Sequence, residues 1–86
     1  MPFIEGLSWD EGAEAKMAAH GVSFYEVEGA VQNIGYAKRH RGYLCVIGRT
    51  DAGRYLFVVL DDEGHGIWYP VTARPATKSE KRLFRR

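Results

Sequence analysis

The chain has 86 residues, a formal net charge of +1 and a single cysteine, Cys45. This length predicts one domain over residues 1–86, and a single cysteine excludes both an internal disulfide and a cysteine-rich zinc site. No apolar stretch approaches the roughly 18–20 residues that cross a membrane, and the first residues do not resemble a signal peptide. We therefore expect a cytoplasmic protein.

In chain order, residues 3–7 predict a short strand, and a first helix follows to about His20. Ser8 and Glu11 have the spacing of a capping box, in which a serine starts the helix. Gly21 can end the helix in the left-handed conformation. Four residues recur at helical spacing and predict its apolar face: Trp9, Ala13, Met17 and His20.

A second helix is predicted from Ser23 to about Asn33, because Ser23 and Glu26 form another capping box. Gly29 lies inside this helix and costs about 1 kcal/mol relative to alanine. We therefore expect a close contact at Gly29. The apolar positions of this helix are Phe24, Val27, Ala30, Val31 and Ile34.

The middle of the chain predicts an antiparallel meander of three to four strands, which are rich in aromatic and β-branched residues. The predicted strands are 36–41, 43–47, 54–60 and 67–74. Residues 55–60 are apolar on both faces, which predicts a central strand covered on both sides. Pro70 lacks a backbone donor, so its strand is expected to lie at an edge or to contain a bulge there.

Thr77 and Glu80 form a third capping box, which opens a basic helix to Arg86. A strand, two helices, an antiparallel meander and a final helix predict an α+β domain. Charge is uneven along this order. Residues 1–35 carry one basic and six acidic side chains, whereas residues 36–86 carry eleven basic and five acidic ones. The basic part indicates a polyanionic partner, although the two parts could simply attract each other.

Several segments occur together in the order found in one protein family. They are Trp9-Asp10 with His20-Gly21-Val22, Ser23-Phe24 with Glu26-Val27, Ile47-Gly48-Arg49 with Gly53-Arg54, and Val71 to Ala76 with Glu80 and Phe84. In these segments the chain resembles the BrnT family of bacterial toxins. The resemblance implies an α+β fold related to RelE-type toxins, and growth arrest by RNA cleavage without a metal or other cofactor. It also implies a ribbon-helix-helix antitoxin that blocks the toxin and helps to repress the operon.

The chain departs from the family at the first helix. The family usually has a lysine before the histidine, where this chain has Ala19, and often one at the position of Ala13. Lys16 is the candidate replacement. The departures leave a second hypothesis open, a non-catalytic module of the same fold that binds RNA or protein. A structural domain without either activity is the third hypothesis, and self-association as a homodimer is an option in each case.

RNA cleavage without a metal needs a base for the 2′-hydroxyl, cations for the phosphate and an acid for the leaving 5′-oxygen. His20 is the candidate acid or base, since an unperturbed histidine has a pKa of about 6.5. Alternatively, it caps its helix or packs beside Met17. The candidate catalytic residues are His20, Arg49, Arg74 and Glu80.

Arginine fits a phosphate through two parallel hydrogen bonds, which favours Arg49, Arg54 and Arg74 as phosphate ligands. The alternative for each is a surface ion pair, for instance with Asp51 or Glu80. Glu80 would orient Arg74 or act as a base, or serve only its capping box.

The remaining RNA contacts are predicted by charge and by aromatic character. Trp68 and Tyr69 lie on opposite faces of one strand, so that one of them could stack on a base. The basic helix could contact RNA or an acidic antitoxin segment, or be merely solvated. The candidate RNA-binding residues are Lys16, Arg54, Tyr69, Lys78, Lys81 and Arg82, and His40 could add a contact.

Overall fold

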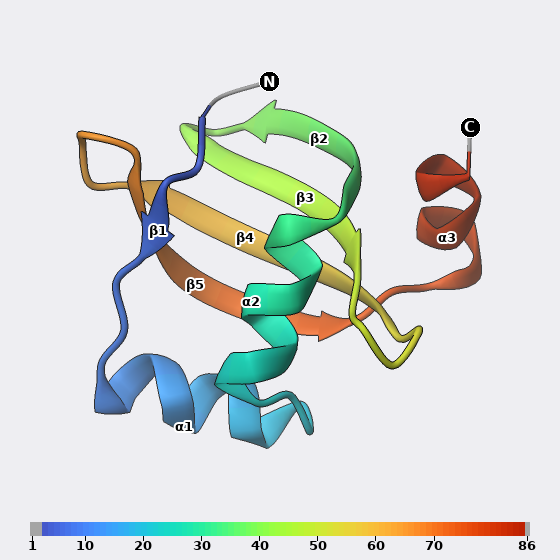
Figure 1. Cartoon of the computed structure of the whole chain (residues 1–86), viewed down its shortest axis with the longest axis horizontal. Coiled ribbons are helices and arrows are strands. Elements are labelled where there is room, and N and C mark those ends of the chain that lie inside the picture. The colour runs from blue at the N-terminus through green and yellow to red at the C-terminus, as the bar shows by residue number, and fades with distance from the viewer. Residues whose placement is uncertain (1–2, 86) are drawn as a thin grey trace.

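The computed structural model describes residues 3–85, which form three helices and a five-stranded sheet (Figure 1). The predicted mixed α+β architecture is confirmed, whereas the expected ends at residues 1 and 86 lie outside the described range. Among residues 3–85 no helix is long and apolar enough to span a membrane. The helices are α1 (Glu11–Ala19), α2 (Phe24–Gln32) and α3 (Lys78–Phe84). The strands are β1 (Gly6–Leu7), β2 (Ile34–His40), β3 (Tyr43–Arg49), β4 (Tyr55–Asp62) and β5 (Ile67–Pro75).

The sheet has the order β1-β5-β4-β3-β2, with β4 in the centre as predicted. Strands β2 to β5 form the antiparallel meander, and β1 joins the edge parallel to β5. The expected strand over residues 3–7 is too long. Only Gly6 and Leu7 come into register with β5, since Glu5 instead bonds to the carbonyl of Gly66 in the preceding turn.

The start of α1 corrects the predicted capping box. Asp10, not Ser8, is the N-cap, and its carboxylate accepts a hydrogen bond from the Ala13 amide at 2.8 Å. Ser8 cannot start the helix because its own amide is still paired with the Trp68 carbonyl, at 2.9 Å, as an extension of β1. The Ser8 hydroxyl is buried without a hydrogen-bond partner. The end of α1 is as predicted, with Gly21 at a φ of 70°.

The other two capping boxes are confirmed. In α2 the Ser23 amide donates to Glu26 at 3.1 Å, and the Glu26 amide donates to the Ser23 hydroxyl at 3.3 Å. In α3 the Thr77 amide donates to Glu80 at 2.9 Å, with the return bond at 3.3 Å. These reciprocal bonds satisfy backbone donors that a helix otherwise leaves free.

The core lies between α1, α2 and one face of the sheet. Its closest backbone approach is at Gly48 of β3. A Cβ there would collide with the carbonyl of Ala30 in α2. The predicted close contact at Gly29 is wrong, because a Cβ at Gly29 would meet only ordinary neighbours at 3.7 Å. The fully buried side chains of the core include Met17, Val27, Leu44, Val46, Leu56, Val58 and Leu60.

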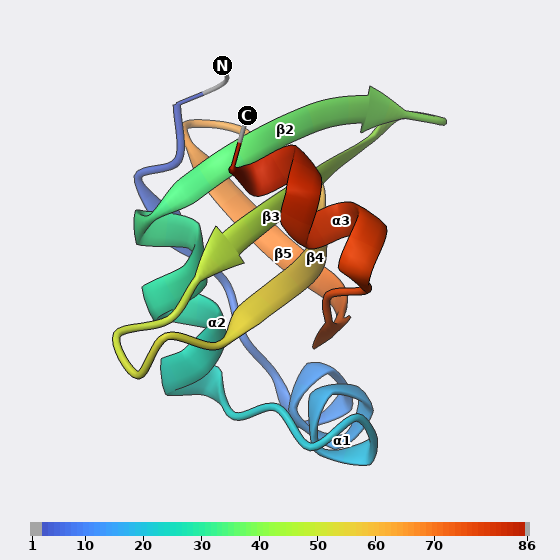
Figure 2. The ribbon, with the colours of Figure 1, turned by 90° about the vertical axis from the view of Figure 1, so that its right-hand side faces the viewer.

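The opposite face of the sheet is only partly covered. Figure 2 shows α2 and α3 on opposite sides of the sheet, with α1 below its end. The helix α3 is short, and Phe84 packs beside Gly35 and edge-on against Tyr55 at 5.1 Å. The prediction that β4 is covered on both sides is therefore wrong in part. Leu56 and its alternate neighbours are buried under α1 and α2, whereas Phe57 and Val59 remain half-buried.

Strand β5 contains the predicted irregularity at Pro70. Its pairing with β4 shifts between Val59 and Leu60, so that Val71 is the extra residue of a bulge. Trp68 turns into the core and its indole donates to the Phe3 carbonyl at 3.1 Å. Tyr69 consequently points the other way, as the alternation predicts.

Candidate nucleic-acid interface

The partly covered side of the sheet is the open face, and the strand register defines it. Phe57 lies between Ile47 and Arg74, and Val59 lies between Cys45 and Thr72. Side chains directly opposite each other share one face. The open face consists of Tyr36, Lys38, Cys45, Ile47, Phe57, Val59, Thr72 and Arg74.

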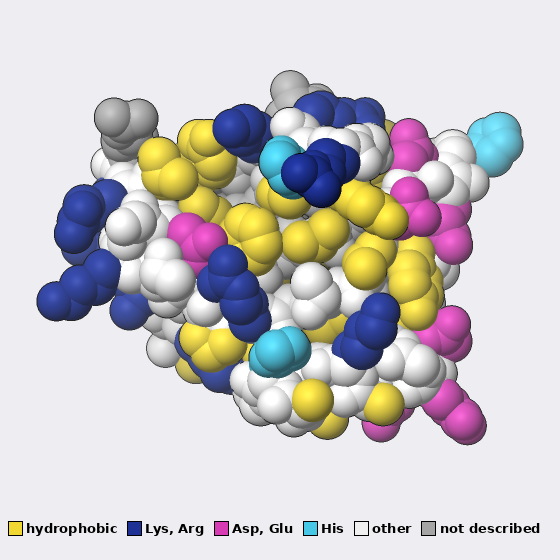
Figure 3. Space-filling view, turned by 180° about the vertical axis from the view of Figure 1, so that it is seen from behind, with side chains coloured by type: hydrophobic (Ala, Val, Ile, Leu, Met, Phe, Trp, Pro, Cys, Tyr) yellow, Lys and Arg dark blue, Asp and Glu magenta, His cyan; other side chains and the backbone are white. Residues whose placement is uncertain are grey.

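Charge is distributed unequally around the open face (Figure 3). Hydrophobic side chains form its floor, while lysine, arginine and histidine side chains stand along its border. Most of the acidic side chains in this view lie together near the β4–β5 turn and along the adjacent margin. A shallow groove of about 260 Å³ runs between the floor and α3. It is lined by Tyr36, Lys38, His40, Cys45, Ile47, Phe57, Glu80 and Leu83.

Arg74 and Glu80 lie together at this groove. The two terminal guanidinium nitrogens of Arg74, Nη1 and Nη2, donate to the two carboxylate oxygens of Glu80, at 2.8 and 2.9 Å. The guanidinium also lies 4.4 Å from the centroid of the Phe57 ring. The carboxylate of Glu80 therefore serves both Arg74 and the capping box of α3. The arrangement holds a planar cation against an aromatic floor, which is a geometry suited to phosphate.

The pair changes the ionisation of both partners. Hydrogen bonds from Arg74 and from the Thr77 amide lower the pKa of Glu80, although its partial burial opposes this. The same carboxylate raises the pKa of Arg74. Glu80 is thus held as an anion, which suits a residue that orients Arg74 better than one that accepts a proton near neutral pH.

Lys16 of α1 and His20, the C-cap residue that follows the helix, are both exposed and lie four residues apart. The expected apolar face of α1 is thus wrong at its end: Ala13 and Met17 are buried, whereas His20 is exposed. His20 closes the helix through its backbone amide, which bonds to Met17 at 2.9 Å, and its side chain remains at the surface.

Tyr69 links β5 to the start of α1. Its hydroxyl donates to the N-cap carboxylate of Asp10 at 3.0 Å. This bond raises the pKa of Tyr69, and bonds from Ala13 and Tyr69 lower the pKa of Asp10. Tyr69 is half-buried, so part of its ring is available for stacking.

Arg49 lies at the end of β3, opposite Tyr55 of β4. Its guanidinium carbon is 5.7 Å from the centroid of the Tyr55 ring, and Lys81 and Arg85 of α3 approach the same ring. It does not form the ion pair with Asp51 considered above, since the ion pairs among residues 3–85 are Arg54–Glu26 and Arg74–Glu80. Tyr55 was not predicted as a site residue, and Arg85 was considered only as one of the basic residues of the last helix.

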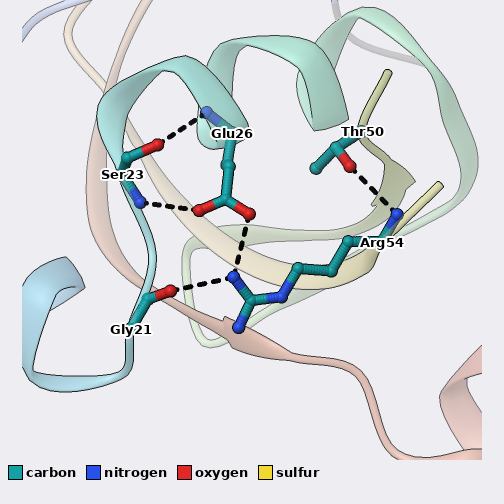
Figure 4. Close-up of polar contacts among 5 residues, drawn as sticks. All are labelled: Gly21, Ser23, Glu26, Thr50 and Arg54. Atoms are coloured by element: carbon teal, nitrogen blue, oxygen red, sulfur yellow. Dashed lines mark hydrogen bonds and ion pairs between the residues drawn. The ribbon is translucent and has the colours of Figure 1, made fainter. Parts of the chain in front are cut away.

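Arg54 binds the loop between α1 and α2 and the start of α2 (Figure 4). Its guanidinium donates to the Gly21 carbonyl and to Glu26, each at 2.8 Å, and so joins β4 to the loop between α1 and α2. Arg54 and the capping bonds of Ser23 lower the pKa of Glu26. This placement supports a structural role for Arg54 and does not bring it to Arg74.

The last two predicted RNA contacts, Lys78 and Arg82, are exposed on α3 at a spacing of four residues. Lys81 and Arg85 lie one helical turn from them and approach the Tyr55 ring. Lys38 and Cys45, which line the groove, were not predicted as site residues. Among residues 3–85 no group of three or more histidine, cysteine or acidic side chains is placed to hold a metal ion.

A second groove lies between α1 and α2, away from the open face. It has a volume of about 720 Å³ and an aromatic wall, in which the Trp9 and Phe24 rings are 4.4 Å apart. Tyr25 in this wall is 81% exposed, and Glu14 and Glu26 add negative charge. This groove is apolar and acidic, in contrast to the basic border of the open face.

A comparison of the chain with protein families, with curated protein sequences and with solved structures finds no match.

Proposed function

We propose that this protein is a BrnT-like endoribonuclease toxin that binds RNA across the open face and cleaves it without a metal. One observation carries the proposal: an apolar sheet face that includes the Phe57 ring is bordered by basic and histidine side chains, and Arg74 lies against that ring. Aromatic floors with basic borders suit single-stranded nucleic acid, because bases stack while phosphates contact the cations.

In the proposed reaction the 2′-oxygen of the substrate attacks the adjacent phosphorus and the bond to the 5′-oxygen breaks. The products are a 2′,3′-cyclic phosphate and a 5′-hydroxyl. The 2′-hydroxyl loses one proton and the 5′-oxygen gains one. His20 accepts the first or donates the second, and water takes the other role. Arg74, positioned by Glu80, and Lys16 stabilise the charge on the phosphate, and Arg49 binds a neighbouring phosphate. Tyr69 stacks on a base, and the basic residues of α3 attract the strand.

The proposal includes a ribbon-helix-helix antitoxin as partner. The groove between α1 and α2 supports such a protein partner, because it is apolar and carries an exposed aromatic side chain. Its acidic border would complement a basic amphipathic segment of that partner.

A second candidate function is a binding module without cleavage. The observation that favours it is the two-bond pairing of Arg74 with Glu80, which occupies both nitrogens that face the carboxylate. An arginine so engaged contacts phosphate only through its remaining edge. In this case RNA would bind to the same face and remain intact.

Expression in bacteria from a tightly repressed promoter distinguishes the two functions. We expect wild type to arrest growth and to degrade bulk RNA after induction, and His20→Ala/Arg74→Ala to do neither. His65→Asn is the matched histidine control, since His65 is exposed in a turn and asparagine tolerates its φ of 57°. Growth without RNA decay in cells that accumulate folded wild-type protein would contradict cleavage and favour the binding module.

A further inference from the structure

Three cations converge on Tyr55 beside the Arg74 site. The charged groups of Arg49, Lys81 and Arg85 lie 5.7, 5.9 and 5.6 Å from the centroid of its ring. Phe84 holds the ring from another side, edge-on at 5.1 Å. We call Tyr55 and these three basic residues the Tyr55 cluster.

The charge of the Tyr55 cluster is not neutralised within the described chain. The ion pairs among residues 3–85 use Glu26 and Glu80, which bind Arg54 and Arg74. The ring attracts each cation, whereas the three like charges repel one another. An anion placed between them would remove that repulsion and form charge-assisted hydrogen bonds.

The Tyr55 cluster continues the Arg74 site along one strand. Tyr55 and Phe57 are alternate residues of β4, so they point to the same side and lie roughly 6.5–7 Å apart. Arg74 stands 4.4 Å above Phe57, and the three cations stand around Tyr55. Two cation-bearing rings thus follow each other along β4, at a spacing that a single extended nucleotide can span.

We propose that the Tyr55 cluster is a phosphate subsite that binds the backbone phosphate next to the one at Arg74. The subsite rests on the proposed function, because it names the path of the RNA strand along β4. Two arginines and a lysine can surround a tetrahedral phosphate from several sides. An acidic protein segment would present one planar carboxylate at a time. Three cations are more than one carboxylate needs for its hydrogen bonds.

Binding of a single-stranded oligonucleotide that cannot be cleaved tests the subsite. We would titrate a fluorescent 2′-O-methyl oligonucleotide at several salt concentrations and follow anisotropy. Lys81→Gln/Arg85→Gln removes two cations of the cluster. Lys78→Gln/Arg82→Gln is the matched control, with the same charge change at two neighbouring α3 residues that make no cation–π contact with Tyr55 among residues 3–85. A charge-preserving variant, Lys81→Arg/Arg85→Lys, shows whether the helix tolerates substitution.

The cluster variant should bind about tenfold more weakly at low salt, because charged hydrogen bonds to one phosphate are lost. Its slope of log affinity against log salt should fall by about 0.7, the value for one phosphate of a single strand. The control variant should lose less affinity, and the charge-preserving variant should bind like wild type. Equal losses in the cluster and control variants would overturn the subsite, since they would indicate general attraction only.

The outcome is separate from that of the proposed function. If wild type binds the oligonucleotide through the cluster but leaves ordinary RNA intact, the subsite holds and cleavage is refuted. If wild type cleaves RNA and the cluster variant binds and cleaves normally, the subsite is refuted and cleavage holds. A glutamate-rich peptide of equal charge completes the test. Cluster-dependent binding of that peptide more tightly than RNA would overturn the phosphate assignment.

Discussion

At the scale of single residues, Arg54 and Arg74 have different roles because they bind different carboxylates. Arg54 donates to Gly21 and Glu26 and holds a loop in place. Arg74 donates to Glu80 and remains beside an aromatic ring on the open face. Both were candidate phosphate ligands from the sequence. The partner of Arg54, Glu26, is 28 residues away in the sequence, so no local pattern predicts the pair. Glu80 is only six residues from Arg74, so that pair could be considered from the sequence.

The Arg74–Glu80 pair predicts a pH dependence. The folded-state pKa of Glu80 lies below its ordinary value of 4.5, so the pair stabilises the fold above that pH. The stabilisation is lost as the pH falls through the folded-state pKa. Glu80→Gln keeps a capping acceptor but should be less stable near neutral pH by roughly 1 kcal/mol, because solvent screens part of the interaction. Urea unfolding of wild type and Glu80→Gln from pH 7 to pH 3 measures this difference in the free energy of unfolding.

The difference between wild type and Glu80→Gln should shrink toward zero at the acidic end. Glu63→Gln is the control, since Glu63 is exposed in a turn and forms no ion pair among residues 3–85. A difference that stays constant with pH would show that the glutamine disturbs packing and not charge.

At the scale of elements, helix starts were predictable where the backbone was free to turn. Ser23 and Thr77 begin their helices as the capping-box pattern predicts. Ser8 does not, because β5 holds its amide in the sheet. That constraint comes from a strand sixty residues later, so the local pattern could not reveal it.

The start of α1 gives a prediction from two neighbouring substitutions. Asp10→Ala removes the N-cap acceptor and the bond from Tyr69, so it should reduce the free energy of unfolding. Ser8→Ala removes a buried hydroxyl without a partner and should leave stability unchanged or raise it. Chemical denaturation of both variants measures the two effects. A larger loss of stability in Ser8→Ala than in Asp10→Ala would contradict Asp10 as the N-cap and favour Ser8.

The packing of α2 on β3 gives a prediction at two glycines. Gly48→Ala places a methyl group against the Ala30 carbonyl and should destabilise the fold by about 1–3 kcal/mol. Gly29→Ala meets only ordinary contacts and replaces glycine inside a helix, so it should be neutral or stabilising by up to about 1 kcal/mol. The midpoint of thermal unfolding should fall in Gly48→Ala, whereas in Gly29→Ala it should stay unchanged or rise. Equal destabilisation would contradict the described contact.

At the scale of the whole molecule, the sequence predicted the order of elements better than the surfaces between them. The apolar run in β4 and the bulge at Pro70 were predictable because each has a local cause. The open face was not predictable, since it depends on how little of the sheet α3 covers. The Tyr55 cluster was missed for the same reason: β3, β4 and α3 meet there only after folding.

The fold also shows where the acidic and basic parts of the chain lie in space. Four of the six acidic residues in the first 35 positions lie in α1 and α2. One of the two ion pairs among residues 3–85 joins the acidic and basic parts. Simple attraction between the two parts therefore accounts for Arg54 but not for the cations around Tyr55. Those cations remain available for a polyanion.

Incubation of purified protein with a fluorescent single-stranded RNA in the presence of a metal chelator tests cleavage most directly. Wild type should produce fragments that end in a 2′,3′-cyclic phosphate and a 5′-hydroxyl, as read by mass spectrometry. His20→Ala should lower the rate by about 10²–10⁴-fold, the range for a lost acid or base, while His65→Asn should not. RNA that stays intact with folded, RNA-binding wild type, or cleavage that His20→Ala leaves unchanged, would contradict the account.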